Sequence, residues 1–194
     1  ASHVHRHLMD KGVGLHLSKG VDHFEQEGNR LRVFFGQGES IVADIVLLSI
    51  GVRPSVSLAQ EAGIELGQKG IKVNKYLETS AKDVYAVGDA IEYPSPLTGI
   101  SWLNYLANPA NRQGRIVGDN MVYGNKEEYE GAIGTSIAKV FDITVGATGM
   151  PAKQLKKLEI PFKSSTTWTV AHAGYYPGSF QITTKLTFDP ENGK

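Results

Sequence analysis

The chain has 194 residues, and its 20 Lys and Arg residues are balanced by 20 Asp and Glu residues. A chain of this length can bury a sizeable core, and zero net charge offers no general attraction to nucleic acid or to an anionic membrane. No run of about 18 apolar residues is available to span a bilayer, and the N-terminal residues lack the pattern of a secretory signal. We therefore expect a globular, cytoplasmic protein with neither nucleic acid nor membrane as a partner.

The sequence contains no cysteine, which excludes disulfide bonds, thiolate zinc sites and a thiol nucleophile within these residues. Histidines crowd the N-terminal part, and His3 and His7 are spaced one helical turn apart. That spacing can hold a metal ion, but no third ligand is fixed by the spacing of other residues. We therefore predict no metal site.

The beginning of the chain predicts a short helix followed by strands of a meander. A helix is expected over residues 2–11, because Gly12 suits the left-handed position that follows a helix. Alternation of apolar with small or polar residues then predicts strands, and glycine-containing pairs predict the turns beside them. The strands are expected at residues 13–17 and 31–35, and the turns at residues 28–29 and 36–38.

Two apolar runs further along the chain predict strands buried in a mostly parallel sheet. Residues 45–50 form an apolar run bounded by Asp and Gly, which is the pattern of a strand covered on both faces. Residues 84–87 form a shorter run that leads directly into Gly88. Between these runs, residues 55–62 predict a short helix that Gly63 ends.

The rest of the chain predicts a long helix and then an antiparallel-sheet module. Residues 104–123 place apolar side chains on one helical face. From Thr135 onward the pattern changes to that of strands, with strands expected at residues 164–170 and 180–188 and a short helix at residues 152–158. Residues 189–194 predict a hairpin turn without its return strand, so we expect the chain to be a fragment of a longer protein.

The sharpest local feature is the run from Thr79 to Ala90, Thr-Ser-Ala-Lys-Asp-Val-Tyr-Ala-Val-Gly-Asp-Ala. It ends in Gly88, where the backbone can approach a ligand closely, and in Asp89, whose carboxylate can accept hydrogen bonds from hydroxyl groups. A ribose or ribityl chain would supply such hydroxyl groups. The alternative is that Asp89 only caps the next turn.

This run resembles the second flavin-binding motif of the FAD-dependent pyridine nucleotide-disulfide oxidoreductases. The resemblance implies that Asp89 holds the ribityl chain of FAD and that Gly88 and Ala90 let the backbone approach the cofactor. Upstream, residues 47–55 resemble the passage from the nucleotide-binding domain back to the flavin domain. There the resemblance implies a cofactor-binding role for Gly51, Arg53 and Pro54.

Downstream, residues 106–115 resemble the start of the helix that faces the flavin ring in this family. A helix N-terminus suits the negative charge that a reduced flavin carries. The resemblance therefore implies that this helix start stabilises the reduced ring, through Ala110, Asn111, Arg112 and Gln113. For direct contacts by the side chains of Arg112 and Arg115, the alternative is a solvated helix face.

Residues 172–178, His-Ala-Gly-Tyr-Tyr-Pro-Gly, resemble part of the C-terminal dimerisation domain of the family. In the coenzyme A-disulfide reductase and NADH oxidase branch, a tyrosine at this place reaches the active centre of the partner subunit. The resemblance therefore implies that Tyr175 or Tyr176 is catalytic across a dimer. His172-Ala173 replaces the His-Pro pair of glutathione-reductase-like members, which favours this branch. The alternative for both tyrosines is packing at the edge of a sheet.

The resemblance implies an α/β chain, α+β overall, in three parts. Residues 1–75 are expected to be the C-terminal part of a three-layer NAD(P)-binding domain, and residues 76–130 the C-terminal part of the FAD-binding domain. Residues 131–194 are expected to be an α+β antiparallel-sheet dimerisation domain, truncated at its C-terminal end. The sequence contains neither the glycine-rich dinucleotide motif nor the redox cysteine of the family, so the fragment alone is not expected to catalyse.

The implied function belongs to the full-length parent, a homodimeric flavoenzyme with FAD as cofactor and NAD(P)H as co-substrate. The first expectation is a coenzyme A-disulfide reductase, which passes electrons to a small-molecule disulfide such as coenzyme A disulfide. Within the family, the alternative is an NADH oxidase or peroxidase that reduces oxygen or peroxide. An alternative of another class is a non-catalytic dimerisation or interaction module.

Overall fold

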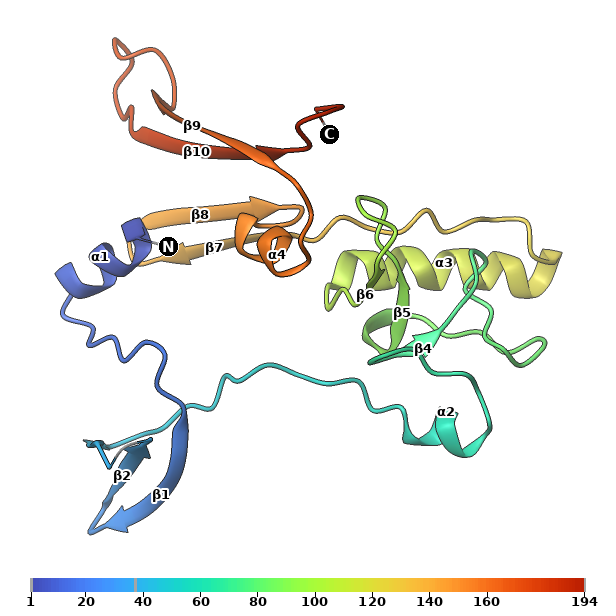
Figure 1. Ribbon diagram of the computed structural model, residues 1–194, viewed down its shortest axis with the longest axis horizontal. Coiled ribbons are helices and arrows are strands. Elements are labelled where there is room, and N and C mark those ends of the chain that lie inside the picture. Colours follow the sequence, from blue (N-terminus) through green and yellow to red (C-terminus); the bar gives the residue numbers. More distant parts are fainter. Residues whose placement is uncertain (1, 37, 194) are drawn as a thin grey trace.

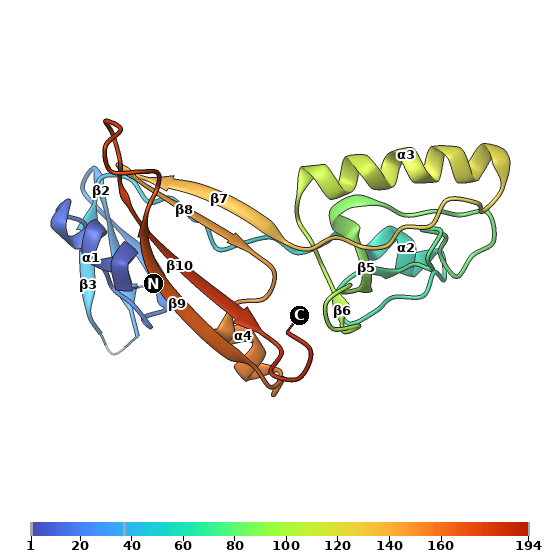
Figure 2. The ribbon, with the colours of Figure 1, turned by 90° about the horizontal axis from the view of Figure 1, so that it is seen from above.

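A computed structural model describes residues 2–36 and 38–193 of the chain. Helices alternate with small sheets whose strands pair mostly antiparallel, which confirms the predicted α/β (α+β overall) class. In Figure 1 the N-terminal helix α1, the first sheet and the C-terminal hairpins lie on one side, and the long helix α3 with strands β4–β6 lies on the other. Extended connections join the two sides (Figure 2). Among the described residues, no helix is both long and apolar enough to cross a bilayer.

The N-terminal helix α1 spans Ser2–Asp10 and ends before Gly12. The φ of Gly12 is +82°, the left-handed conformation that favours glycine, and the predicted helix is therefore confirmed. The strand predicted at residues 13–17 is wrong: the segment runs to a turn at Ser18, and no described strand pairs with it. Alternating apolar residues do not form a strand where no neighbour supplies the ladder hydrogen bonds.

The first sheet is an antiparallel meander of neighbouring strands, β1 (Val21–Glu27), β2 (Arg30–Phe35) and β3 (Ser40–Ala43). The strand predicted at residues 31–35 is confirmed as the middle strand of this sheet. The predicted turn at residues 28–29 is also present, with Gly28 at a φ of +59°. The turn predicted at residues 36–38 includes Gln37, which lies outside the described residues.

The buried strand predicted at residues 45–50 is wrong. The segment has no regular secondary structure, and Ile45, Leu47 and Ile50 are 86%, 87% and 88% exposed. A central strand is buried only when strands pair on both of its sides and helices cover both of its faces. None of the described strands pairs with residues 45–50, so the apolar run lies exposed in the connection between β3 and α2.

The main hydrophobic core consists of buried residues that pack against α3, namely Leu77, Ile91, Tyr93 and Tyr129. The elements around it are α2 (Ser57–Glu61), β4 (Ile71–Lys72), β5 (Ile91–Pro94), β6 (Ser101–Trp102) and α3 (Ala107–Tyr123). Strand β5 pairs in parallel with β4 and antiparallel with β6. The helices predicted at residues 55–62 and 104–123 are confirmed as α2 and α3.

The strand predicted at residues 84–87 is wrong. Within the described chain this segment forms only an isolated bridge between Tyr85 and Glu78, and Val84 and Val87 are exposed. It leads instead into a 3-10 turn, η1 (Gly88–Ala90), and the buried strand is the following one, β5. The short apolar run therefore precedes the buried strand of this region rather than forming it.

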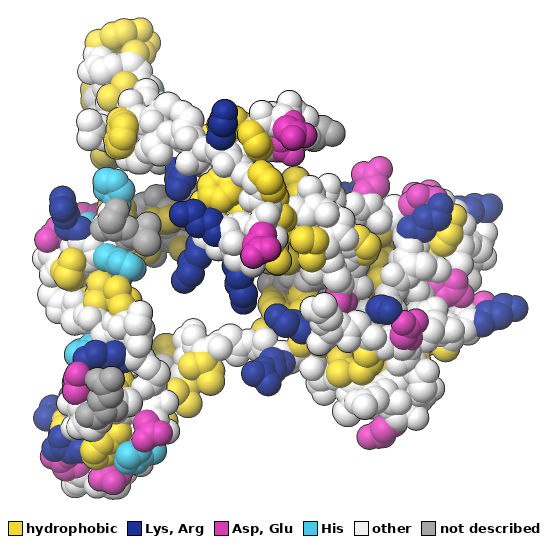
Figure 3. Space-filling model, viewed as in Figure 1, with side chains coloured by type: hydrophobic (Ala, Val, Ile, Leu, Met, Phe, Trp, Pro, Cys, Tyr) yellow, Lys and Arg dark blue, Asp and Glu magenta, His cyan; other side chains and the backbone are white. Residues whose placement is uncertain are grey.

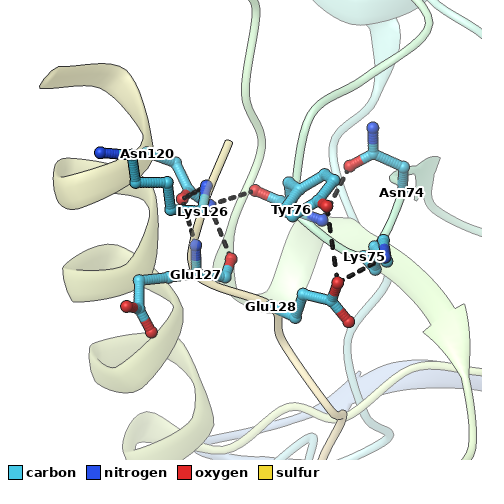
Figure 4. A network of polar contacts seen from close by, with 7 residues as sticks. All are labelled: Asn74, Lys75, Tyr76, Asn120, Lys126, Glu127 and Glu128. Atoms are coloured by element: carbon cyan, nitrogen blue, oxygen red, sulfur yellow. Dashed lines mark hydrogen bonds and ion pairs between the residues drawn. The ribbon is translucent and has the colours of Figure 1, made fainter. Parts of the chain in front are cut away.

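The C-terminal end of α3 is fixed by the buried side chain of Asn120 (Figure 4). Its amide group donates to the backbone oxygens of Tyr76 (3.1 Å) and Glu127 (2.9 Å). It also accepts from the backbone N–H groups of Lys126 (3.0 Å) and Glu127 (2.9 Å). The predicted apolar face of this helix is thus partly polar, and the apolar residue Met121 of the same helix is exposed.

The C-terminal part contains two antiparallel hairpins joined through a short helix. The first hairpin pairs β7 (Thr135–Val140) with β8 (Ile143–Thr148), and the second pairs β9 (Lys163–Val170) with β10 (Gln181–Phe188), with α4 (Ala152–Lys157) between them. The predicted strands at residues 164–170 and 180–188 and the predicted helix at residues 152–158 are therefore confirmed. The turn predicted at residues 189–194 forms around Asp189, whose carboxylate accepts from the N–H of Glu191 at 2.7 Å, although Lys194 lies outside the described residues.

The second hairpin carries exposed apolar side chains on both of its faces. Trp168 lies opposite Thr183 and Leu186 lies opposite Ser165, and directly opposed residues share a face. Trp168 and Leu186 therefore point to opposite sides, and both are exposed. Figure 3 shows hydrophobic side chains at the surface of the β9–β10 loop as well.

A polar contact joins α1 to the turn between β7 and β8. The carboxylate of Asp142 lies 2.7 Å from Nε2 of His7 and 3.3 Å from Nζ of Lys11. The pKa of Asp142 is lowered most by a hydrogen bond from its own backbone N–H, and less by the charges of Lys11 and His7. The adjacent Phe141 has a φ of +53° and lies edge-on to the ring of His7. The beginning of the chain is thereby held against the first C-terminal hairpin.

Replacement of Leu77 by Ala tests the core assignment. Leu77 is fully buried, so its truncation should reduce the free energy of unfolding by about 2–5 kcal/mol through lost burial and the cavity left behind. The free energy is measured by chemical denaturation. The matched control is Leu58→Ala in α2, where the side chain is exposed and a change below about 0.5 kcal/mol is expected. Equal losses in the two variants would contradict the assignment.

Candidate functional site

The turn η1 presents the strongest candidate residues of the sequence motif. The backbone of Val87 is extended, and Gly88 then turns with a φ of +77°, a conformation in which a side chain would be strained. Asp89 is exposed, and none of the hydrogen bonds or ion pairs among the described residues engages its carboxylate. The alternative that Asp89 caps a turn is therefore wrong, and its carboxylate is available to a ligand.

Helix α3 holds this turn in place. The backbone N–H of Gly88 donates to Oε1 of Gln113 at 2.7 Å, and Gln113 is only 1% exposed. A Cβ added to Gly88 would lie 3.8 Å from the Cβ of Ala110, so the turn lies directly against the beginning of the helix. The structure thus brings η1 together with Ala110 and Gln113. The side chain of Gln113 faces inward and positions the backbone rather than facing a ligand.

The beginning of α3 is open to a charged ligand. Its first turn has no side-chain cap, and the free N–H groups of such a turn attract negative charge. A shallow groove on this part of the helix is lined by Ala107, Ala110, Asn111, Gly114 and Arg115. Asn111, Arg112 and Arg115 are exposed, which agrees with the solvated-face alternative as well as with contacts to a ligand.

Thr79 and Ser80, the first residues of the motif, accept hydrogen bonds from the neighbouring backbone. The hydroxyl group of Ser80 accepts a hydrogen bond from the backbone N–H of Glu65 at 2.7 Å. The hydroxyl group of Thr79 accepts from the backbone N–H of Ala81 at 3.2 Å. Both side chains therefore organise the backbone, a use that the pattern of residues did not reveal.

Glu92 is a buried polar residue of this region that the sequence analysis missed. It is 6% exposed, and its carboxylate accepts from the backbone N–H groups of Gln68 (3.2 Å), Lys69 (2.7 Å) and Gly70 (3.0 Å). The hydroxyl group of Ser101 donates to it as well. Burial by itself would raise the pKa of Glu92. The four hydrogen bonds together lower it by more, so the pKa lies below its ordinary value. An acidic residue inside the apolar strand Ile-Glu-Tyr was the available signal.

Other predicted site residues lie apart from the turn. Gly51, Arg53 and Pro54 lie in the connection between β3 and α2, and no hydrogen bond or ion pair within the described ranges joins them to η1. Tyr175 and Tyr176 lie in the β9–β10 loop, with ring centroids 4.8 Å apart, and Figures 1 and 2 both place this loop far from α3. Tyr175 is 83% exposed and Tyr176 is also exposed, and both the catalytic and the packing interpretation of these tyrosines stay predictions.

Comparison with known proteins identifies the class to which this fold and motif belong. Residues 1–114 match the model of the pyridine nucleotide-disulphide oxidoreductases, which is more than half of the chain. The chain belongs to this family, and the predicted resemblance is confirmed. Proteins of the family with FAD, NADH or NADPH in their descriptions are among the structures it resembles, in agreement with the predicted cofactors.

Two curated relatives match most of this chain. The chain is 30% identical to an NADH oxidase of Methanocaldococcus jannaschii over 98% of its own length and 42% of that protein. It is 28% identical to a coenzyme A disulfide reductase of Staphylococcus aureus over 84% of its length and 37% of that protein. The chain thus spans about two-fifths of the curated relatives that it matches.

Solved structures agree with these relatives. Reduced CoADR-RHD of Bacillus anthracis has a TM-score of 0.90 at 42% identity, over 97% of this chain and 34% of that one. An NAD-dependent persulfide reductase of A. fulgidus has a TM-score of 0.92 at 31% identity, over 98% of this chain and 35% of that one. Both structures therefore share the fold over nearly the whole of this chain.

Replacement of Gln113 by Leu tests the bond that holds the turn. Leu has a similar size but cannot accept the N–H of Gly88, and an unsatisfied buried donor costs about 1–3 kcal/mol of stability. We expect a loss of that size in chemical denaturation, together with faster hydrogen exchange at the amide of Gly88. Gln60→Leu on the exposed surface of α2 is the matched control. Unchanged exchange at Gly88 in Gln113→Leu would show that the bond does not hold the turn.

Proposed function

We propose that the whole protein containing this sequence is a flavoenzyme that takes electrons from NAD(P)H and passes them through FAD to a small-molecule disulfide. A coenzyme A-disulfide reductase is the closest match to this chemistry. The observation that carries the proposal is the free carboxylate of Asp89 on a glycine turn set against the uncapped start of α3. Relatives named for disulfide and persulfide reduction support the choice of acceptor.

The residues present at the turn fit the cofactor. Asp89 would accept hydrogen bonds from the hydroxyl groups of the ribityl chain, and Gly88 and Ala90 would allow the backbone to approach it. The start of α3 at Ala110 would stabilise negative charge on the flavin ring, while Gln113 would contribute by holding Gly88 in place. When bound, FAD would supply the electron transfer itself.

The three-part organisation belongs to the same proposal. Residues 1–75 would complete an NAD(P)-binding domain, residues 76–130 an FAD-binding domain, and residues 131–194 would form the dimerisation domain. The two hairpins and α4 fall within the third part, and η1 with α3 falls within the second. Gly51, Arg53 and Pro54 would lie where the nucleotide-binding part passes to the flavin part.

An NADH oxidase is the second candidate within the family. The observation in its favour is the 30% identity to the Methanocaldococcus jannaschii protein of that name across nearly the whole chain. Oxygen or peroxide would then replace the disulfide as acceptor. Full-length protein assayed with NADH or NADPH against coenzyme A disulfide and against oxygen would separate the two activities.

A homodimer would complete the active centre. Tyr175 and Tyr176 are exposed, and the β9–β10 loop that carries them lies far from α3 in Figures 1 and 2, so they would serve a flavin site in the partner subunit. A phenol there can donate a hydrogen bond to substrate. The exposed apolar side chains on both faces of the β9–β10 hairpin would be covered by the partner and by the rest of the subunit.

Replacement of Asp89 by Ala in the full-length protein tests the cofactor site. Loss of charge-assisted hydrogen bonds of about 1.5–3 kcal/mol should weaken FAD binding by roughly 10- to 100-fold. FAD retained after desalting is measured from its visible absorbance. Asp119→Ala, an exposed aspartate further along α3, should retain FAD as the unaltered protein does. Full FAD content in Asp89→Ala would refute the assignment, and a protein that FAD does not stabilise against heat would favour the non-catalytic module.

Replacement of Leu186 by Glu tests the dimer. A charge on the exposed apolar face of β10 would have to be desolvated in an interface, so we expect the dimer to dissociate to monomers in sedimentation velocity experiments. Ile41→Glu places the same charge on an exposed residue of β3, outside the C-terminal hairpins, and should leave the dimer intact. A monomeric unaltered protein, or a dimer that survives Leu186→Glu, would contradict this interface.

A further inference from the structure

The loop at residues 67–70 wraps around the carboxylate of Glu92 so closely that side chains are excluded at both of its ends. A Cβ added to Gly67 would lie 2.6 Å from the carboxyl carbon of Glu92. A Cβ added to Gly70 would lie 2.8 Å from the backbone oxygen of Ala90 and 2.9 Å from Cδ2 of Leu103. The loop therefore touches the carboxylate on one side and the last residue of η1 on the other.

The same loop is continuous with the strand that pairs beside the turn. Gly67 donates its N–H to the backbone oxygen of Gly70 at 2.8 Å, which closes the loop on itself. The next residue, Ile71, begins β4 and lies opposite Ile91, which directly follows η1. The loop and the end of the turn are thereby joined through the β4–β5 pair.

Charge explains why this position needs a carboxylate. The N–H groups of Lys69 and Gly70 both point at Oε2 of Glu92, while Oε1 receives the N–H of Gln68 and the hydroxyl of Ser101. Every donor is thus met by an acceptor that is almost completely buried. A glutamine would have to place its NH2 group against the N–H of Gln68 or against those of Lys69 and Gly70, and a donor facing a donor is repulsive.

We propose that Glu92 is a positioning residue for the candidate cofactor site: by holding the 67–70 loop against Ala90, it fixes the turn that presents Asp89. That the ligand is FAD rests on the proposed function. The positioning of the turn by Glu92 involves only residues of this chain. Glu92 is buried behind the turn and contacts the loop and β6, so it acts on the site through the backbone.

The test is Glu92→Gln, followed by nuclear magnetic resonance of the backbone amides of the full chain. We expect the amide signals of residues 68–70 to shift and their hydrogen exchange to accelerate roughly tenfold or more. The amides of Gly88, Asp89 and Ala90 should shift with them. Glu65→Gln is the matched control, because this glutamate lies close by in sequence and its carboxylate is exposed; it should leave residues 88–90 unchanged.

Shifts confined to residues 68–70 in Glu92→Gln would overturn the inference, since Glu92 would then support only its own loop. If Glu92→Gln does not fold, Ser101→Ala removes one of the four donors and is judged by the same amides of residues 88–90. Retention of FAD by the full-length protein is the second readout, with about tenfold weaker binding expected in Glu92→Gln than in Glu65→Gln. If the unaltered protein binds no FAD while residues 88–90 shift in Glu92→Gln, the proposed function fails and the positioning of Asp89 by Glu92 stands.

Discussion

The hydrogen bond from the backbone N–H of Gly88 to the side chain of Gln113 is the constraint on which the candidate site depends. The φ of Gly88 is positive, and among the described residues no backbone oxygen accepts this N–H. A buried N–H needs an acceptor, and Gln113 supplies it from the third residue after Ala110. The same bond therefore sets the distance between the turn and the helix and leaves the adjacent Asp89 facing outward. Glu92 constrains the turn from the other side through backbone contacts, so two buried polar side chains hold one exposed carboxylate.

Local signals in the sequence were sufficient for some elements and insufficient for others. Gly12 and Gly63 ended helices where their left-handed conformation was expected, and the β9–β10 hairpin formed where alternation predicted it, because its two strands are close in sequence and supply each other's hydrogen bonds. The runs at residues 45–50 and 84–87 contain the residue types of buried strands but did not form strands. Their hydrogen bonds would have to come from distant segments, and no local pattern reports whether such segments are present.

The polar residues that organise the core were harder to predict than the exposed candidate residue Asp89. Asp89 could be predicted because it lies in a family motif beside a glycine. Gln113 and Asn120 lie on a helix, where polar side chains normally face solvent. Glu92 lies between Ile91 and Tyr93 in β5. Their burial depends on backbone N–H groups from residues 68–70, 88 and 126–127, which approach only after folding. Positions in sequence do not show that such donors converge, so a pattern of residue types cannot identify these acceptors.

The proposed function accounts for each of the surfaces that lie exposed in this chain. The uncapped start of α3, the apolar residues 45–50 and both faces of the β9–β10 hairpin lie exposed in different parts of the fold. In the proposed flavoenzyme the first would face FAD, the second would become a strand of a complete nucleotide-binding domain, and the third would contact a partner subunit. The contact of α1 with Asp142 differs from these exposed surfaces, because it is made within the chain and joins the expected first part to the expected third part. The fold therefore ties α1 to the first hairpin, and in the proposed homodimer the exposed Tyr175 of the second hairpin would reach the flavin site of the partner subunit.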